Sequence, residues 1–358
     1  MLLSVAVVFF AVLGALYLHL KPALSALGVG RIIQPVGNVD CKTVPHLQAC
    51  EKLVLHQPTG LVYLACSTPH SRTHWTPALG QLNTSGRSES DYVATYDPRT
   101  DVINRLSFSG LLSPGGISST TGNLSAPDAH KVGADSVIEV LKTRIESGTL
   151  QHVRTFQDPA VIITPNDVVG SPDGRSVHFT NDHRHKAGLK RLVSLLALAR
   201  DTSIGFCHAD KGCKFAYTGL HASNGIVKGT SPGNDTFYVA DSVLGDVTVL
   251  ERQSDNTLAL TEVIKTDRAL DNLAIDANGA LWAAGLSDAL GMAMRQMNDP
   301  SALVASSAMR ITVNRGLGSF YGEKYNVDKV FEDPGELASG STSAVYDAER
   351  GRLFMHGV

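Results

Sequence analysis

The sequence predicts an all-β fold, a six-bladed β-propeller that follows an N-terminal hydrophobic segment. Two observations lead to this prediction: short strand-like segments alternate with turn signals along the chain, and one phrase recurs among them. The 358 residues include 33 glycines and 15 prolines, which suits many turns better than long helices. Hydrophobic residues make up 43% of the chain, enough for a packed core. The net charge of −3 gives no electrostatic basis for nucleic-acid binding.

The first segment, residues 1–20, has no charged side chain between positions 2 and 20. It is long enough to span a bilayer, and it also matches the hydrophobic part of a signal peptide. We therefore expect the chain to enter the secretory pathway, as a secreted protein or as a membrane-anchored one that faces the lumen or the outside. A buried hydrophobic helix is the alternative. Three glycosylation sequons agree with this compartment, at Asn83, Asn123 and Asn234.

The recurring phrase starts with an oxygen-bearing side chain, continues into a short apolar run and a glycine turn, and ends in a second strand. Its four copies begin at Glu51, Asn166, Asn224 and Asp271, and the turn glycine follows 9, 8, 9 and 8 positions later. A fifth copy, 341–357, has the turn but no acidic opener. Repeats of roughly 45–60 residues built from short antiparallel strands are typical of propeller blades. Residues 31–358 would then form a single propeller domain.

Further strand signals fill the space between the copies. Ten segments mix β-branched and aromatic residues at strand length, with turn signals between them. They are 60–67, 92–97, 136–142, 160–164, 176–180, 236–241, 246–252, 280–285, 308–313 and 352–357.

Two segments depart from this strand pattern. Residues 189–200 are rich in helix formers and have one strongly apolar side. We expect a helix there that packs on the propeller, or that acts as a lid or a membrane-surface helix near the site. Residues 118–136 are small and polar throughout, which predicts a loop.

Among the five cysteines, Cys207 and Cys213 flank the short polar stretch HADKG. In an oxidising compartment this spacing predicts a local disulfide. Two free thiols are the alternative, and a metal site is disfavoured because only His208 lies nearby in the sequence. The odd number of cysteines leaves at least one thiol unpaired within the monomer.

The openers of the repeats are candidate metal ligands. The innermost strand of each blade lines the channel of a propeller, so Glu51, Asn166, Asn224, Asp271 and Asn272 would all face one axis. Five hard oxygen donors, two of them carboxylates, suit Ca²⁺. The absence of His and Cys from the set disfavours Zn²⁺. A single asparagine in such a place more often serves turn or cap chemistry, whereas five residues in register favour a calcium site.

An ordered set of short phrases extends this interpretation. With these phrases the chain resembles the serum paraoxonase/arylesterase family, in its fungal branch, whose members are six-bladed calcium-dependent propeller hydrolases. The phrases are CEKL (50–53), PGGIS (114–118), TPNDV (164–168), TNDH (180–183), SNGI (223–226), LDNL (270–273) and SGSTSAV (339–345).

The resemblance implies that the five candidate ligands hold a catalytic calcium ion. It also implies that the ion polarises an ester, lactone or phosphoryl oxygen of a small-molecule substrate while a neighbouring water attacks. A second, structural calcium would use Asp167 and the carbonyl of Ile117. Lys52 stands where the resemblance implies an Asp, and a cation there should oppose this second ion.

Several positions differ from the family pattern. The resemblance implies a general-base histidine where this chain has Gly115, a supporting histidine at Ala126, and a third one at Leu286. His183 is therefore the candidate catalytic residue that remains, with a structural histidine at a strand end as the alternative.

The resemblance also implies a further C-terminal strand whose Cys pairs with Cys41. The chain stops at Val358, so we expect a propeller that is incomplete at its C-terminus.

Three functions follow from these observations. The first is a calcium-dependent hydrolase of esters or lactones. The second is a calcium-stabilised propeller with little or no catalysis that acts as a binding or scaffold protein. The third is another propeller enzyme, of gluconolactonase-like or strictosidine-synthase-like type. Membrane association through residues 1–20 and the helix 189–200 is compatible with the first.

Overall fold

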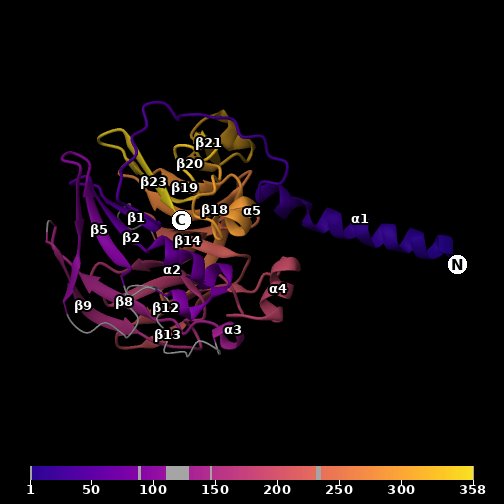
Figure 1. The fold of residues 1–358 in the computed structure, drawn as a ribbon, viewed down its shortest axis with the longest axis horizontal. Coiled ribbons are helices and arrows are strands. Elements are labelled where there is room, and N and C mark those ends of the chain that lie inside the picture. The colour runs from indigo at the N-terminus through magenta and orange to yellow at the C-terminus, as the bar shows by residue number, and fades with distance from the viewer. Residues whose placement is uncertain (1, 88–89, 110–128, 146, 231–234, 358) are drawn as a thin grey trace.

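A computed structural model of the protein describes residues 2–87, 90–109, 129–145, 147–230 and 235–357. The chain forms a β-propeller body from which one long helix, α1 (Leu2–Ala26), projects (Figure 1). The predicted propeller is thereby confirmed.

Four antiparallel sheets have four strands each and follow one another along the chain. The first contains β1 (Cys50–His56), β2 (Leu61–Cys66), β5 (Tyr92–Asp97) and β6 (Val102–Arg105). The second contains β10 (Pro165–Gly170), β11 (Ser176–Asn181), β12 (Thr202–His208) and β13 (Gly212–Leu220). The third contains β14 (Ser223–Lys228), β15 (Thr236–Asp241), β16 (Asp246–Arg252) and β17 (Leu258–Lys265). The fourth contains β18 (Ala269–Ile275), β19 (Leu281–Leu286), β20 (Ser306–Val313) and β21 (Tyr325–Asp333).

A fifth sheet has three strands, β7 (Ser107–Ser109), β9 (Thr149–Phe156) and β8 (Ile138–Lys142), with β7 parallel to β9. The hairpin of β22 (Ser341–Asp347) and β23 (Arg352–Gly357) lies between the fourth sheet and the first, since β22 packs against both β18 and β1. The prediction of six four-stranded blades is thus confirmed only in part. The described residues form five sheets of three or four strands, this hairpin and one short two-stranded sheet.

Short elements connect the sheets. They are α2 (Pro69–His74), η1 (Pro77–Leu79), η2 (Thr84–Gly86), α3 (Ala129–Val132), α4 (Leu189–Leu196), α5 (Ala289–Gly291), the π-helical turn η3 (Met292–Gln296), η4 (Leu317–Tyr321) and the two-residue strands β3 (Trp75–Thr76) and β4 (Gln81–Leu82).

The five copies of the recurring phrase are the hairpins β1–β2, β10–β11, β14–β15, β18–β19 and β22–β23. Four of their turn glycines, Gly60, Gly174, Gly279 and Gly351, have a left-handed backbone that favours glycine, with φ of +66° at Gly174 and +80° at Gly279. The turn glycine of the third copy, Gly233, lies outside the described residues. Apolar side chains fill the space between neighbouring sheets, as Val247, Leu270 and Ala283 do between the third and fourth sheets. The repeat therefore sets both the turns and the core.

One predicted strand, 160–164, is wrong. Residues 159–161 form a turn in which the backbone N–H groups of Val161 and Ile162 donate to the carbonyl of Asp158. Ile162 is fully buried in this turn, so its hydrophobicity serves the core rather than a strand.

The two predicted helical regions change in length. The N-terminal helix continues past position 20 to Ala26, and its segment Val7–Ala26 is apolar and long enough to cross a membrane. Helix α4 ends at Leu196 rather than at position 200. The chain leaves the helix at Leu198, which adopts a left-handed conformation with φ of +49°.

The predicted loop 118–136 is only partly described. Residues 129–132 form the short helix α3 rather than a loop, and Ala129 is fully buried in a cluster with Trp75 and Leu82. Positions 118–128 lie outside the described residues.

The disulfide between Cys207 and Cys213 is confirmed; these residues are direct partners in the β12–β13 pair. A second disulfide, Cys50–Cys66, was not predicted, although it likewise joins direct partners of β1 and β2. Cys41 is an exposed free cysteine.

Candidate functional site

The first strands of the five repeat hairpins, here called the inner strands, carry a register shift at the same place; they are β1, β10, β14, β18 and β22. The shifts fall between Cys50 and Lys52, Pro165 and Val168, Ser223 and Ile226, Leu270 and Leu273, and Ser341 and Ser343. A bulge of this kind leaves its extra residues outside the hydrogen-bond ladder and re-aims their side chains. The residues released in this way are Glu51, Asn166, Asp167, Asn224, Gly225, Asp271, Asn272 and Thr342.

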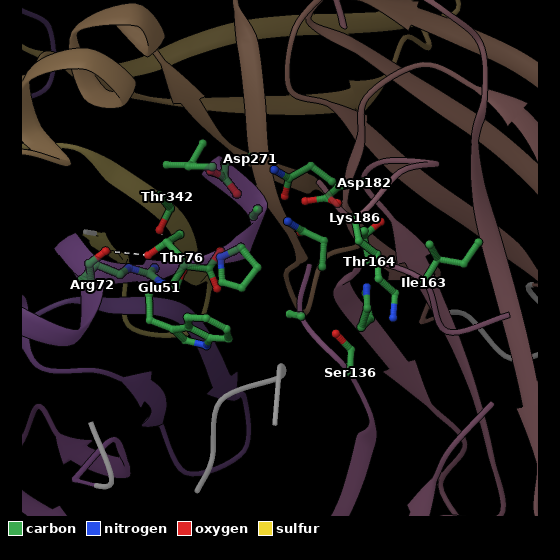
Figure 2. A pocket seen from close by; sticks show the side chains of 18 of the residues that line it. Glu51, Arg72, Thr76, Ser136, Ile163, Thr164, Asp182, Lys186, Asp271 and Thr342 are labelled. Carbon is green, nitrogen blue, oxygen red and sulfur yellow. Dashed lines mark hydrogen bonds between the residues drawn. The ribbon is translucent and has the colours of Figure 1, made fainter. Parts of the chain in front are cut away.

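Four of the five predicted ligands line one cavity of about 140 Å³, here called the deep cavity: Glu51, Asn166, Asn224 and Asp271. Thr342, which opens the fifth repeat, lines it too. Figure 2 shows the side chains of this cavity, with Glu51 and Thr342 on one side and Asp182 and Lys186 on the other. Thr342 was not predicted, because the fifth copy has a hydroxyl where the other four copies have a carboxylate or an amide.

Close backbone contact brings two of these residues together. A side chain on Gly225 would place its Cβ 2.5 Å from the carbonyl oxygen of Asp271, so only glycine lets β14 approach β18 this closely. Asn224 and Asp271, on either side of this contact, are both buried. Gly225 in the third repeat is thus a packing requirement of the site.

Two amide oxygens in the deep cavity have no partner. Oδ1 of Asn166 and Oδ1 of Asn224 are both buried and accept no hydrogen bond. A buried polar atom left in this state costs about 1–3 kcal/mol. The arrangement would be relieved by a cation that both oxygens could coordinate.

The carboxylates of the site also favour a cation. Burial raises the pKa of Asp271 well above its usual value, and the nearby negative charge of Glu51 raises it further. Glu51 is held by Thr342, whose hydroxyl donates to its carbonyl at 2.9 Å, and by Asn272, whose amide donates to its Oε1 at 3.1 Å. Two neighbouring carboxylates and two unpartnered amide oxygens are the kind of donors that a hard, oxygen-preferring ion would accept.

Asn272, the fifth predicted ligand, is not a lining residue of the deep cavity. Its amide nitrogen donates to Glu51, and its Oδ1 accepts from Nζ of Lys52 at 3.0 Å. The structure therefore places Asn272 as a link between Glu51 and Lys52.

The predicted second-calcium residues are only partly described. Nζ of Lys52 lies 2.6 Å from Oδ2 of Asp167, and this oxygen also accepts from the backbone N–H of Ile226. The expectation that Lys52 opposes a second ion agrees with this ion pair. Ile117 lies outside the described residues.

Across the described ranges, no group of three or more His, Cys, Asp and Glu side chains is arranged to hold a metal ion. The donor set at the deep cavity is of a different kind, because amides supply half of its four predicted oxygen donors.

A larger cavity of about 680 Å³, here called the outer cavity, adjoins the deep one and shares Asn166, Asp182, Asn224 and Asp271 with it. Its other walls are largely apolar and come from α1, α4 and the region around α5; they include Leu24, Leu27, Leu192, Leu195 and Leu290.

Three basic side chains lie near the deep cavity: Arg72, Lys186 and Arg191. Burial lowers the pKa of Lys186 and of Arg191. Arg191 donates to the backbone carbonyls of Pro77 and Ala78, which ties α4 to η1 beside both cavities. The deep cavity thus combines acidic side chains with a basic wall.

His183, the predicted catalytic residue, lines the outer cavity but not the deep one. Its Nδ1 lies 2.9 Å from Oδ1 of Asp182, yet neither atom makes a hydrogen bond of acceptable geometry. The short distance alone does not make the two side chains a proton-transfer pair, because proton transfer needs an aligned donor and acceptor. Among the positions where the resemblance implies histidines, Leu286 is buried in the outer cavity wall, and Gly115 and Ala126 lie outside the described residues.

Of the three predicted glycosylation sites, Asn83 is exposed and caps η2. Asn123 and Asn234 lie outside the described residues.

The sequence model of a protein family described as Arylesterase matches residues 33–356. Serum paraoxonase/arylesterase 2 of Gallus gallus is 25% identical over 217 residues, which cover 60% of this chain and 57% of that protein. The Homo sapiens protein of the same name is 26% identical, with coverages of 60% and 57%. The chain thus spans just over half the length of these relatives. Serum paraoxonase/arylesterase 1 of Rattus norvegicus is 22% identical over 94% of this chain and 91% of that protein.

Solved structures with a similar arrangement are more distant. A gluconolactonase from Xanthomonas campestris is 13% identical and has a TM-score of 0.47, over 91% of this chain and 96% of that one. A periplasmic gluconolactonase of Pseudomonas aeruginosa is 12% identical with a TM-score of 0.44, over 85% of this chain and 77% of that one. These likenesses are too remote to bear on the chemistry of the site.

Proposed function

The chain belongs to the arylesterase family, and on that premise we propose that it is a calcium-dependent hydrolase of small-molecule esters or lactones. The observation that carries the proposal is the pair of buried, unpartnered amide oxygens of Asn166 and Asn224, which line one cavity with two carboxylates. Oxygen donors of this kind fit Ca²⁺.

We propose that Glu51, Asn166, Asn224 and Asp271 hold the ion through their side-chain oxygens. Asn272 is the fifth proposed ligand, and in the structure its amide oxygen accepts a hydrogen bond from Lys52. When bound, calcium would supply Lewis-acid polarisation of a carbonyl or phosphoryl oxygen. The second, structural ion is not part of the proposal, because Lys52 already neutralises Asp167.

The chain's own residues would prepare this reaction. The apolar walls of the outer cavity would hold the acyl or aryl part of the substrate away from water, next to the deep cavity. The positive charges of Arg72 and Lys186 would favour the negative charge that develops on an oxygen near the wall. His183 would face the substrate from the outer cavity.

The test is hydrolysis of phenyl acetate and of a δ-lactone by the full chain, first in EDTA and then after calcium is added back. We expect activity that disappears in EDTA and returns with calcium. The variants Asn224→Ala and Asp271→Ala should lower calcium affinity and activity together, whereas Asn326→Ala, at an exposed asparagine of β21, should change neither. Hydrolysis that is indifferent to EDTA and to both site variants would contradict the proposal.

A second candidate, a calcium-stabilised binding or scaffold protein, is favoured by one observation. Leu286 gives the outer cavity an apolar wall where the resemblance implies a histidine. A calcium-dependent rise in melting temperature without turnover of a broad ester and lactone panel would support this candidate over the first.

We also propose that the protein enters the secretory pathway and associates with membranes through α1 and α4. The apolar helix α1 and the two disulfides agree with this compartment. Helix α4 exposes Leu189, Leu192 and Leu196 to solvent, with exposed fractions of 74%, 50% and 55%. Changing all three to Glu should reduce flotation of the full chain with phosphatidylcholine vesicles. Unchanged flotation would exclude α4 from the membrane contact.

A further inference from the structure

A second histidine lies on the wall of the outer cavity, in an arrangement that the sequence did not indicate. His221 precedes β14 and lines this cavity together with Asn224 and Asp271. It is buried, with 7% of its surface exposed, and its Nδ1 lies 2.9 Å from Oδ2 of Asp241 at the end of β15. Asp241 is buried as well. The pair is therefore well shielded from bulk water.

The carboxylate of Asp241 is held in a fixed orientation. Its Oδ1 accepts from the backbone N–H groups of Val243 and Leu244, at 2.8 and 2.7 Å, which leaves Oδ2 for the histidine. Because a carboxylate only accepts hydrogen bonds, Nδ1 of His221 must be the donor. The proton of the neutral ring then sits on Nδ1, and Nε2 carries a lone pair.

Nε2 of His221 has no hydrogen-bond partner within the part of the chain that the structure describes. This atom is not fully buried. It is thus the ring nitrogen available to the cavity. His130 and His183 also line this cavity, but neither forms a hydrogen bond from its ring to a carboxylate of the described residues. His221 is the cavity histidine whose tautomer and orientation are set by an acid.

We propose that His221 is the general base of the site and that Asp241 is its positioning residue. The proposal rests on the proposed hydrolysis of esters or lactones. Nε2 takes a proton from water as the water oxygen bonds to the carbonyl carbon, and Asp241 stabilises the imidazolium that results. The same proton then passes to the leaving alkoxide oxygen as the bond between carbon and that oxygen breaks. The products are a carboxylic acid and an alcohol, or one hydroxy acid from a lactone.

The pair takes the role for which His183 was the sequence-based candidate. His221 lies just before β14, three residues ahead of the proposed ligand Asn224, so one short segment of the chain carries both the ligand and the base. No electron donor or further reactant is required, because water and the ester supply every atom of the products.

The experiment compares the full chain with His221→Gln and Asp241→Asn in calcium-containing buffer. His221→Gln should lower kcat by about 10²-fold or more with little change in KM, because general-base assistance is worth about 10²–10⁴-fold. Asp241→Asn keeps an acceptor for Val243 and Leu244 but turns its amide toward Nδ1. This favours the tautomer with the proton on Nε2 and should also lower kcat. His152→Gln is the matched control, because His152 pairs with Glu139 at 2.8 Å on the β8–β9 strands, away from both cavities.

Two readouts do not depend on turnover. Calcium affinity, measured by titration calorimetry, should be the same in His221→Gln as in the wild type, which also shows that the variant folds. In nitrogen-15 spectra of histidine-labelled protein, the signal lost in His221→Gln should show the Nδ1–H tautomer in the wild type, and it should change to Nε2–H in Asp241→Asn.

The outcomes separate this proposal from the calcium proposal. Calcium-dependent hydrolysis that is unchanged in His221→Gln, or a wild-type Nε2–H tautomer, would overturn the dyad and leave the metal site standing. Hydrolysis that is unchanged by EDTA but is lost in His221→Gln would overturn the calcium dependence and support the roles of His221 and Asp241. Absence of hydrolysis in the wild type under both conditions would overturn both.

Discussion

The ammonium group of Lys52 lies 2.6 Å from Oδ2 of Asp167, and this ion pair joins inner strands that belong to different sheets. Both side chains are largely buried, with 21% and 6% of their surfaces exposed. Lys52 also donates to Asn272 on a third inner strand. One positive charge thus holds together three strands around the channel.

Removal of this charge should destabilise the protein. In Lys52→Met, Asp167 loses its partner and remains buried, which costs about 3 kcal/mol when a buried ion pair is broken from one side. The free energy of unfolding, measured with urea at saturating calcium, should fall by that amount. Lys324→Met, which removes an exposed partner of Glu262, should change it by less than about 0.5 kcal/mol. Equal effects of the two variants would contradict the proposed role of Lys52.

Asp271→Asn should have opposite effects with and without calcium. Burial and the charge of Glu51 both disfavour the Asp271 carboxylate and raise its pKa, so loss of the charge relieves repulsion in the metal-free protein. The melting temperature in EDTA should rise, by about 2–4 °C for each kcal/mol relieved. The increase that calcium produces in the wild type should shrink. The exposed Asp299→Asn should alter neither value, and a lower melting temperature of Asp271→Asn in EDTA would refute the explanation.

The stability of the protein should fall with acid because of His178. Its ring packs between Phe206 and Phe237, and burial lowers its pKa to about 4. The unfolded chain binds a proton near pH 6.5, whereas the folded chain does so only near pH 4. The contribution of His178 to the free energy of unfolding is therefore fully present above pH 6.5. It declines as the pH falls from there toward 4, by on the order of 3 kcal/mol in total.

His178→Gln tests this dependence, because the variant has no titrating ring. Urea unfolding at several pH values should give a shallower decline between pH 6.5 and 4 than in the wild type. The exposed His70→Gln should keep the wild-type slope. An unchanged slope in His178→Gln would mean that other groups cause the loss of stability in acid.

The two disulfides should contribute unequally. Cys50–Cys66 spans 16 positions and Cys207–Cys213 spans 6, so the first restricts the unfolded chain more. Replacement of each pair by alanine should lower the free energy of unfolding by about 3 and about 2 kcal/mol, respectively. The first replacement should also weaken calcium binding, since Cys50 directly precedes Glu51. A larger loss from the Cys207–Cys213 pair would contradict this order.

The repeats explain why much of the fold could be predicted. A turn that needs a left-handed backbone, as at Gly174, requires glycine and is therefore easy to recognise in the sequence. Each turn recognised in this way joins the two strands of an inner hairpin. The outer strands were harder to predict from the sequence. One of them, β12 (Thr202–His208), contains small and polar residues that give little indication of a strand. The segment at Ile162 was wrongly predicted as a strand for the opposite reason. Its residues are hydrophobic because they pack into the core, although the backbone there forms a turn.

The site was predicted as far as the repeat extends. The opening positions gave four residues of the deep cavity, but side-chain pairing between strands could not be read from one sequence. His221 and Asp241 are 20 positions apart and form no recognisable motif, so their hydrogen bond becomes visible only in the folded chain. The Cys50–Cys66 disulfide did leave a signal. The two cysteines flank the turn of the first hairpin almost symmetrically, and the bulge at Glu51 supplies the one-residue offset that brings them opposite each other.

The shared bulge of the inner strands has a consequence for how such a molecule can vary. Residues at the bulge, such as Asn166, Asn224 and Thr342, take no part in the ladder that holds each hairpin together. An exchange at one of these positions alters the chemistry that meets at the axis and leaves the strand pairing unchanged. Single substitutions at these five equivalent places could therefore change which ion the proposed site prefers, or abolish ion binding there, without any change of fold.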